Sequence, residues 1–567
     1  MNQHTMSSKN LSAVLLALAI GACATVAPRS SPEDVARAAA TISADDLVAR
    51  INVLSSDDFE GRAPGTRGET LTVDYLVREF KALGLSPGNP DGTYVQKVPL
   101  SEFLSKPVAV VRTPQGRDIA WKHPQDYVAF SYERKPRVHI QDSPLVFVGY
   151  GVIAPEYQWD DFKGMDLRGK TLVVLVNDPQ IPDPADAAKL DDSMFKGKAM
   201  TYYGRWTYKY ETGVKLGADA VIIIHETKPA AYPYEVVMNS WGRENFDVRS
   251  STPSEEYPPI AAWMRLETAN ELLAATGHDL ETLRKAALRR DFKPVILGTT
   301  ITFDVANAWH ELDSNNVVAR IEGADPKLRN ETVVYTAHWD HFGWDPKLPG
   351  TKTDQVYHGA LDNASGVASL LALARAYKSL PRAPSRSILF ICTTGEERGL
   401  LGARYYVQNP LYSLDRTLGA INIDGINPFG RTKDITIVGM GRSTLDDMAV
   451  ALAAAQGRSA HPESRPEQGG FYRSDHLPFL RVGIPAANMG GGIEYIGRPA
   501  SYADETRDKF TAENYHKVKD VLQPDYDFSG AIEDLQILFR LGNEIAETKE
   551  YPAWKPGSEF SRPTPGR

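Results

Sequence analysis

The alternation of strand-like and helix-like segments after Asn316 constrains the fold most strongly. Short β-branched and aliphatic runs predict strands, and apolar residues at helical spacing predict helices. Strands are expected at residues 332–337, 387–393, 418–423, 435–439 and 484–488, and helices at 365–379, 399–408, 443–456 and 528–547. This order predicts an α/β fold with a mostly parallel central sheet and helices on both faces.

The earlier part of the chain has other patterns. In residues 45–84 the apolar residues have helical spacing, with a Gly-, Arg- and Pro-rich interruption. Near residue 141 a segment begins in which most of the expected elements are strands. A chain of 567 residues is too long for one core, so we expect at least two packed units. The expected divisions are a tether at 23–42, a discontinuous main domain at 43–135 and 300–550, an inserted β-rich domain at 136–299, and a tail at 551–567.

The N-terminus has the pattern of a bacterial export signal. The apolar run at residues 11–20 follows a polar start, and it is shorter than the about 20 apolar residues that span a bilayer. It ends in Ile20-Gly21-Ala22-Cys23, which resembles the lipobox in which the cysteine is lipidated. We therefore expect a lipoprotein signal peptide at 1–22 and attachment through Cys23 to a membrane of the cell envelope, facing the periplasm or the exterior. The alternative is an ordinary signal peptide in which Cys23 has no such role.

Charge and cysteine content exclude some functions. The net charge is -9 and no long run of lysine or arginine occurs, which argues against a nucleic-acid partner. If Cys23 carries a lipid, Cys392 is the one remaining cysteine, so no intramolecular disulfide can form. The apolar residues before Cys392 predict a buried strand, where a thiol behaves as a small hydrophobic group. We expect no catalytic role for it.

Acidic and imidazole side chains follow three of the expected strands, and one more acidic residue lies in a Gly-rich loop before a helix. Because ligands bind outside the carboxyl ends of strands in open α/β sheets, these side chains are expected to meet at one edge. Singly, each has a commoner structural explanation, such as a helix cap, a turn or a buried histidine. The residues concerned are His338, Asp340, Asp362, Glu396, Glu397 and Asp424.

These residue types suit zinc, which accepts histidine nitrogen and carboxylate oxygen and keeps a position for water in catalytic sites. If a second histidine joins His338 and three of these carboxylates, one carboxylate must bridge for each of two ions to have three protein ligands. Bridging places two ions about 3.5–4 Å apart, as in hydrolytic two-metal sites. The pattern therefore predicts metal-assisted hydrolysis.

Five segments, in this order, resemble the co-catalytic zinc peptidases of metallopeptidase family 28. They are residues 336–343, 359–366, 394–397, 422–424 and 474–476. The resemblance covers roughly residues 43–135 and 300–550. It implies two zinc ions per chain, with Asp362 bridging them, His338 and Asp424 completing one site, and Glu397 and His476 completing the other.

The resemblance also implies the catalytic roles. Glu396 would leave the metals free and act as general base toward a metal-activated water, which contributes roughly 10²–10⁴ in rate. Asp340 would hydrogen-bond His338 and fix its ring orientation. Tyr495 is expected to line the substrate pocket.

Other polar residues receive supporting roles only. His341 and His358 do not match ligand positions, so structural or supporting roles are expected for them. His516 and Asp520 resemble a structural feature of the family near the last helix.

The inserted segment resembles the protease-associated domain found within such peptidases. The residues that carry this likeness are 147–151, 166–170 and 217–225. By analogy, the domain is expected to shape access to the cleft.

Together these patterns predict an exported metal-dependent aminopeptidase that hydrolyses N-terminal residues from peptides. A zinc carboxypeptidase or dipeptidase of the glutamate-carboxypeptidase type shares all five ligands, and the sequence does not locate the residues that read one peptide terminus. A glutaminyl-cyclase-like transferase fits less well, because its single-metal site does not require five ligands. A surface-anchored binding protein, as in transferrin-receptor-like relatives, would have lost ligands, and none is lost here.

Overall fold

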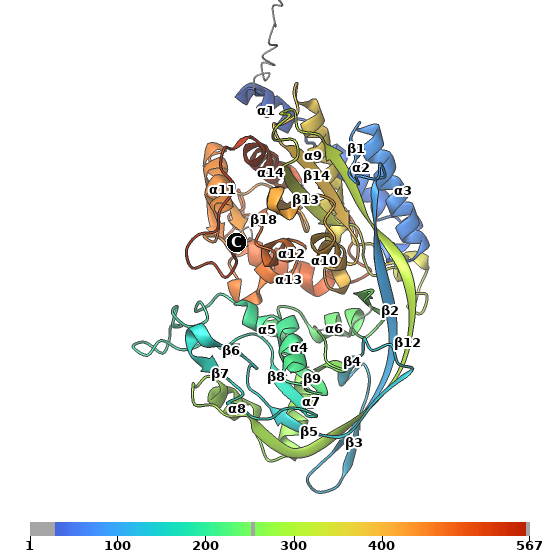
Figure 1. The fold of residues 1–567 in the computed structure, drawn as a ribbon, viewed down its shortest axis with the longest axis vertical. Helices are drawn as coiled ribbons and strands as arrows, with labels where there is room; N and C mark the ends of the chain where they lie inside the picture. Colours follow the sequence, from blue (N-terminus) through green and yellow to red (C-terminus); the bar gives the residue numbers. More distant parts are fainter. Residues whose placement is uncertain (1–28, 251–255, 563–567) are drawn as a thin grey trace, which may run out of the picture.

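A computed structural model of the chain describes residues 29–250 and 256–562. Figure 1 shows two lobes, one built from both ends of the chain and one from its middle, connected by two long strands. These strands are β2 (Val95–Arg112) and β12 (Val295–Ile321). No helix in the described ranges combines the length and apolar character needed to cross a membrane. The expected signal peptide and Cys23 lie outside the described residues.

The first lobe contains a twisted sheet in the order β17-β16-β18-β15-β13-β14-β12. Strand β13 lies at its centre and pairs in parallel with β14 and β15, and β15 pairs in parallel with β18. The predicted α/β fold with parallel central strands is confirmed. The strands are β13 (Thr332–His338), β14 (Ser387–Thr393), β15 (Thr417–Asn422), β16 (Asp434–Ile437), β17 (Ser459–Pro462) and β18 (Ala486–Gly491).

Helices cover both faces of this sheet because successive strand residues point to opposite sides. Along β13, Val333 and Tyr335 belong to one apolar core, whereas Val334 belongs to another on the opposite face. The first core is covered by α1 (Pro32–Ala39), α2 (Ala44–Leu54), α3 (Arg67–Ala82), α9 (Ser365–Ser379), α11 (Thr444–Ala455) and α14 (Ser529–Glu547), and the second by α10 (Leu401–Gln408) and α12 (His476–Arg481). Helix α13 (Tyr502–Glu513) lies at the edge that faces the second lobe (Figure 1).

The second lobe has its own parallel strands, in the order β5-β8-β9-β11, with β4 antiparallel at the edge. Two groups of helices pack on its opposite faces, so this lobe is more helical than the expected β-rich domain. Its strands are β3 (Asp118–Trp121), β4 (Tyr127–Phe130), β5 (Arg137–Phe147), β6 (Ile153–Ala154), β7 (Trp159–Asp160), β8 (Thr171–Leu175), β9 (Ala220–Ile224), β10 (Asn245–Val248) and β11 (Ile260–Met264). Its helices are α4 (Trp206–Lys215), α5 (Thr227–Ala230), α6 (Tyr234–Ser240), α7 (Leu266–Ala275) and α8 (Leu280–Ala287).

Strand β12 joins the two sheets into one. On one edge its first residues pair with β5 and its last residues pair with β14, and on the other edge it pairs with β2 and β1 (Ser86–Pro87). The core of the second lobe includes Ala109, Tyr127 and Phe303, so this lobe takes in residues on both sides of the expected 136–299 segment. Neither β2 nor β12 was among the strands expected from the sequence.

Candidate metal centre

The functional side chains follow the carboxyl ends of three adjacent parallel strands, β13, β14 and β15. His338 is the last residue of β13, and its Nε2 lies 3.3 Å from Asp362 Oδ1 and 3.2 Å from Asp424 Oδ1. The imidazole is 1% exposed, whereas the carboxylates of Asp362 and Asp424 are 13% and 26% exposed. The expected convergence of these three residues at one sheet edge therefore occurs.

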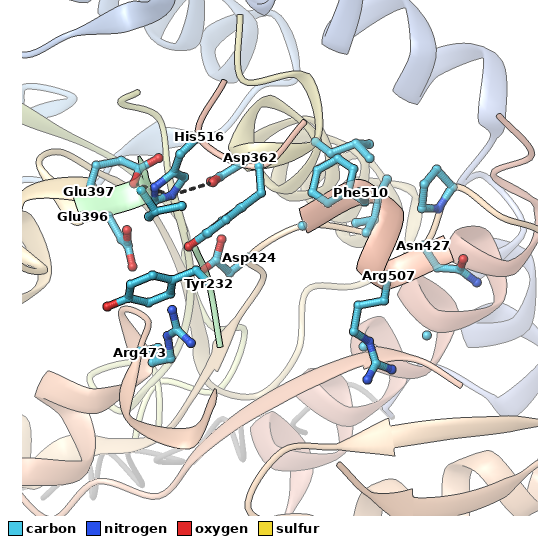
Figure 2. Close-up of a pocket in the computed structure, with 18 of the residues that line it drawn as sticks. Tyr232, Asp362, Glu396, Glu397, Asp424, Asn427, Arg473, Arg507, Phe510 and His516 are labelled. Carbon is cyan, nitrogen blue, oxygen red and sulfur yellow. Dashed lines mark ion pairs between the residues drawn. The ribbon is translucent and has the colours of Figure 1, made fainter. Parts of the chain in front are cut away.

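The other oxygen of Asp362 faces a different histidine. His516 Nε2 lies 3.3 Å from Asp362 Oδ2 and 3.0 Å from Glu397 Oε2 (Figure 2). Glu397 Oε1 lies 2.5 Å from His341 Nδ1. Asp362 thus stands between two imidazoles, one on each of its oxygens, which is the arrangement that a carboxylate bridging two cations requires.

His516 lies where the sequence placed His476, beside Asp362 and Glu397, and no ion pair joins His476 to the cluster in the described residues. His476 begins α12, and its Nε2 lies 2.8 Å from the carbonyl oxygen of Phe471. Its Nδ1 is buried and has no hydrogen-bond partner among the described residues. The segment that carries His516 follows α13 instead of a strand, so the strand-end argument could not place it.

The turn after β14 separates the two adjacent glutamates. Gly395 has a φ of 64°, which favours glycine, and a short 3₁₀ turn, Glu396–Arg398, follows it. Glu397 points to the histidines, whereas the carboxylate of Glu396 faces the cavity and makes no hydrogen bond within the described part of the chain (Figure 2). One glutamate is thus placed to ligate and the other stays free, as the sequence suggested.

Asp340 supports the site differently from the prediction. Its main-chain carbonyl oxygen lies 3.2 Å from His338 Nδ1, whereas its carboxylate Oδ1 is 3.8 Å from that nitrogen. The carboxylate instead accepts a hydrogen bond of 3.1 Å from the backbone N–H of Glu396. Asp340 therefore orients His338 through its main chain and fixes the loop of Glu396 through its side chain.

The electrostatics of the cluster favour bound cations. Burial raises the pKa of Glu396 well above its usual value, and the carboxylates of Asp424, Asp475 and Glu397 raise it further. Burial alone would lower the pKa of His516, but the carboxylates of Glu397 and Asp362 outweigh it and raise that pKa to about 9. The carboxylates of this cluster thus stabilise positive charge beside them, and bound divalent ions would provide that positive charge.

The donor set fits two zinc ions. Candidate ligand atoms of His338, Asp362 and Glu397 all lie within 4.8 Å of one another. With Asp362 shared, Asp424 joins His338 on one side and His516 joins Glu397 on the other. Each side then offers one imidazole and carboxylate oxygens, which are zinc's usual nitrogen and oxygen donors.

Arg62 holds together the loops that carry these residues, a role that the sequence did not reveal. Its side chain is 1% exposed. Its guanidinium donates hydrogen bonds of 2.7–2.9 Å to the carbonyl oxygens of Leu54, Trp339, His358 and Gly359. The loops beside His338 and Asp362 are therefore tied to the end of α2.

Asp520 fixes the backbone at Asp362 from another direction. Its carboxylate accepts hydrogen bonds from the N–H groups of Leu361, at 3.1 Å, and Asp362, at 2.9 Å. Gly359 begins this loop with a φ of 55°, and a Cβ there would lie 2.3 Å from the carbonyl oxygen of Asp362. Asp520 and His516, four residues apart, thus act on the same loop.

Replacing Arg62 with alanine should destabilise the protein, because four buried carbonyl groups would lose their donor. We expect the free energy of unfolding to fall by about 3 kcal/mol and the zinc content to fall with it, measured by denaturant unfolding and metal analysis. Arg67→Ala is the control, since Arg67 is 60% exposed in its ion pair with Glu60 and should contribute less than about 0.5 kcal/mol. Equal stability of both variants would contradict the role given to Arg62.

A cavity of about 500 Å³ opens beside the cluster, and both lobes line it. Arg205, Trp206 and Tyr232 come from the second lobe. Tyr495 also lines it, as expected, and donates a hydrogen bond of 2.9 Å to Asn427 Oδ1. Its contact with substrate stays a prediction.

Comparison with known proteins supports a peptide hydrolase. Residues 316–539 match the model of peptidase family M28. The chain is 32% identical over 164 residues to leupeptin-inactivating enzyme 1 of Streptomyces exfoliatus, covering 27% of this chain and 35% of that protein. It is 30% identical over 168 residues to aminopeptidase YwaD of Bacillus subtilis, covering 29% of this chain and 32% of the relative.

Among solved structures, the aminopeptidase from Aneurinibacillus sp. strain AM-1 shares the fold. Its TM-score is 0.51 at 20% identity, over 94% of this chain and 100% of that chain. The chain spans about a third of the length of the two curated relatives.

Proposed function

We propose that this chain, whose residues 316–539 match peptidase family M28, is a two-zinc aminopeptidase that removes N-terminal residues from peptides. The observation that carries the proposal is Asp362, which faces His338 with one oxygen and His516 with the other. His338 and Asp424 would hold one ion, and Glu397 and His516 would hold the other. Bound zinc supplies a Lewis acid that polarises the scissile carbonyl and makes water acidic enough to deprotonate near neutral pH.

Glu396 performs the proton transfers in this proposal. Its free carboxylate faces the cavity, where it accepts a proton from the attacking water and returns it to the leaving amine. The hydrogen bond from its backbone N–H to Asp340 keeps its loop in place while the proton moves.

The remaining expectations belong to this proposal as well. We assign the second lobe to the protease-associated type, and its place in the cavity wall supports a role in limiting substrate size. Lipid attachment at Cys23 would hold the enzyme at the bacterial cell envelope. Its protein partners stay open.

End-blocked peptides and metal removal test the activity. We expect hydrolysis of peptides with a free N-terminal amine, no hydrolysis of their N-acetylated forms, and loss of activity with a zinc chelator that added zinc restores. Release of C-terminal residues from N-acetylated peptides would instead identify a carboxypeptidase. A zinc-loaded protein that cleaves neither set would be a binding protein.

A further inference from the structure

Two arginines face the catalytic cavity from opposite lobes. Arg205 lies immediately before α4 in the second lobe, and Arg473 lies shortly before α12 in the first. Figure 2 shows Arg473 below the ring of Tyr232, on the side of the cavity that carries Glu396 and Asp424. The site therefore has a basic group of residues within reach of its acidic cluster.

Neither guanidinium forms an ion pair with a carboxylate in the described part of the chain. Arg205 Nε is buried and has no hydrogen-bond partner there. Among the described residues, Arg473 Nη1 reaches only the carbonyl oxygens of Ala230 and Gln468, both at 3.5 Å. Both arginines are half-buried, and hydrogen bonds to other described residues use little of the donor capacity of their guanidinium groups.

Aromatic rings hold both guanidinium groups in position. Arg205 Cζ lies 4.7 Å from the ring centroid of Trp206, and Arg473 Cζ lies 4.9 Å from that of Tyr232. Stacking of this kind orients the planar group while its N–H donors stay available at the edge. Both rings belong to the second lobe, as does Arg205, whereas Arg473 belongs to the first. The packing of the two lobes therefore sets the position of Arg473 relative to Arg205.

Two positively charged guanidinium groups beside the same cavity repel each other, and an anion bound between them would remove this cost. Burial lowers the pKa of Arg205 to about 10, and the positive charge of nearby Arg473 lowers it as well. Asp362, Asp424 and Glu397 face the histidines, and the proposed zinc ions would neutralise them. Glu396 faces the cavity and is kept for proton transfer. A carboxylate from substrate would satisfy the arginines, because carboxylates match the forked donors of guanidinium.

We propose that Arg205 and Arg473 together bind a carboxylate of the residue that follows the scissile bond. This inference rests on the proposed function, because the scissile carbonyl must lie at the zinc cluster. One residue beyond that bond adds only about 3.3–3.6 Å, so a carboxylate in this place belongs to a dipeptide C-terminus or to an acidic side chain at the second position. Dipeptides, or peptides with an acidic second residue, are then the preferred substrates.

The test compares four substrates that differ in their carboxylates. They are a neutral dipeptide, its C-terminal amide, a dipeptide amide with glutamate in the second position, and an aminoacyl p-nitroanilide. Preference for the free dipeptide over its amide assigns the site to the main-chain carboxylate. Preference for the glutamate amide over the neutral amide assigns it to an acidic side chain. Equal rates with all four would overturn the proposal.

Variants then assign the recognition to these side chains. In Arg205→Ala and Arg473→Ala, we expect kcat/KM for the preferred carboxylate substrate to fall about 100-fold, mainly through KM, while p-nitroanilide hydrolysis changes less than about twofold. Arg205→Lys and Arg473→Lys keep the positive charge but lack the forked donors of guanidinium. Their kcat/KM for this substrate should lie between those of the wild type and the alanine variants. Arg498→Ala, a change at an exposed arginine, is the control and should match the wild type. Equal losses on all substrates would indicate a structural role and overturn the proposal.

A binding measurement separates this inference from the proposed activity. The neutral dipeptide and the glutamate dipeptide amide are each titrated calorimetrically into Glu396→Gln and into Glu396→Gln combined with Arg473→Ala, so both kinds of carboxylate are tested without turnover. Binding that weakens about 100-fold with the second change supports the carboxylate site even if the wild type cleaves none of the four substrates. Absent or unchanged binding overturns it, whatever the enzyme hydrolyses.

Discussion

Glu396→Gln is expected to lower the turnover of a free-amine peptide by about 10²- to 10⁴-fold, the range that general acid–base catalysis contributes. The amide has nearly the same shape but cannot accept the proton from water. Zinc content should stay at the wild-type level, because Glu396 faces the cavity and Glu397 is the glutamate that contacts the histidines. Steady-state kinetics with metal analysis of the same preparation measures both quantities.

Asp362→Ala is the matched comparison for Glu396→Gln. It removes the carboxylate that stands between His338 and His516, so both zinc ions and activity should be lost. Normal folding of each variant is checked by thermal unfolding. Full activity in Glu396→Gln would remove the proposed mechanism, and loss of zinc from it would instead make Glu396 a ligand.

The framework of the site was predictable because it depends on local patterns. Residues 387–393 are apolar and β-branched and form β14 with the expected bounds. Parallel pairing then brings the carboxyl ends of β13, β14 and β15 together, so residues that follow these strands meet without further information. His338, Glu397 and Asp424 were identified in this way, and the Gly-rich loop before a helix, together with the family resemblance, identified Asp362.

The residues that were missed depend on tertiary contacts. His516 follows α13 and reaches the cluster because Asp520 accepts hydrogen bonds from the backbone of the Asp362 loop. The spacing of His516 and Asp520 was visible in the sequence, but no strand end indicated where it would lie. Arg205 belongs to the other lobe, and its place beside Arg473 follows from the packing of two lobes, which no local pattern encodes.

His516→Ala and His476→Ala should differ sharply, because His516, and not His476, lies beside Asp362 and Glu397. Loss of His516 removes the imidazole that faces Asp362 and Glu397. The expected zinc content falls from about two ions per chain to about one, and turnover falls by at least about 100-fold. Metal analysis after dialysis and kinetics at saturating substrate measure the two effects.

His476→Ala should keep its zinc and most of its activity. His476 Nε2 faces the carbonyl oxygen of Phe471, so removing it leaves a buried acceptor without its partner and lowers the free energy of unfolding by about 1–3 kcal/mol. Denaturant unfolding of both variants separates this loss of stability from loss of metal. If His476→Ala lost an ion while His516→Ala kept two, His516 would not be a ligand, and the two-zinc arrangement built on Asp362 would fail with it.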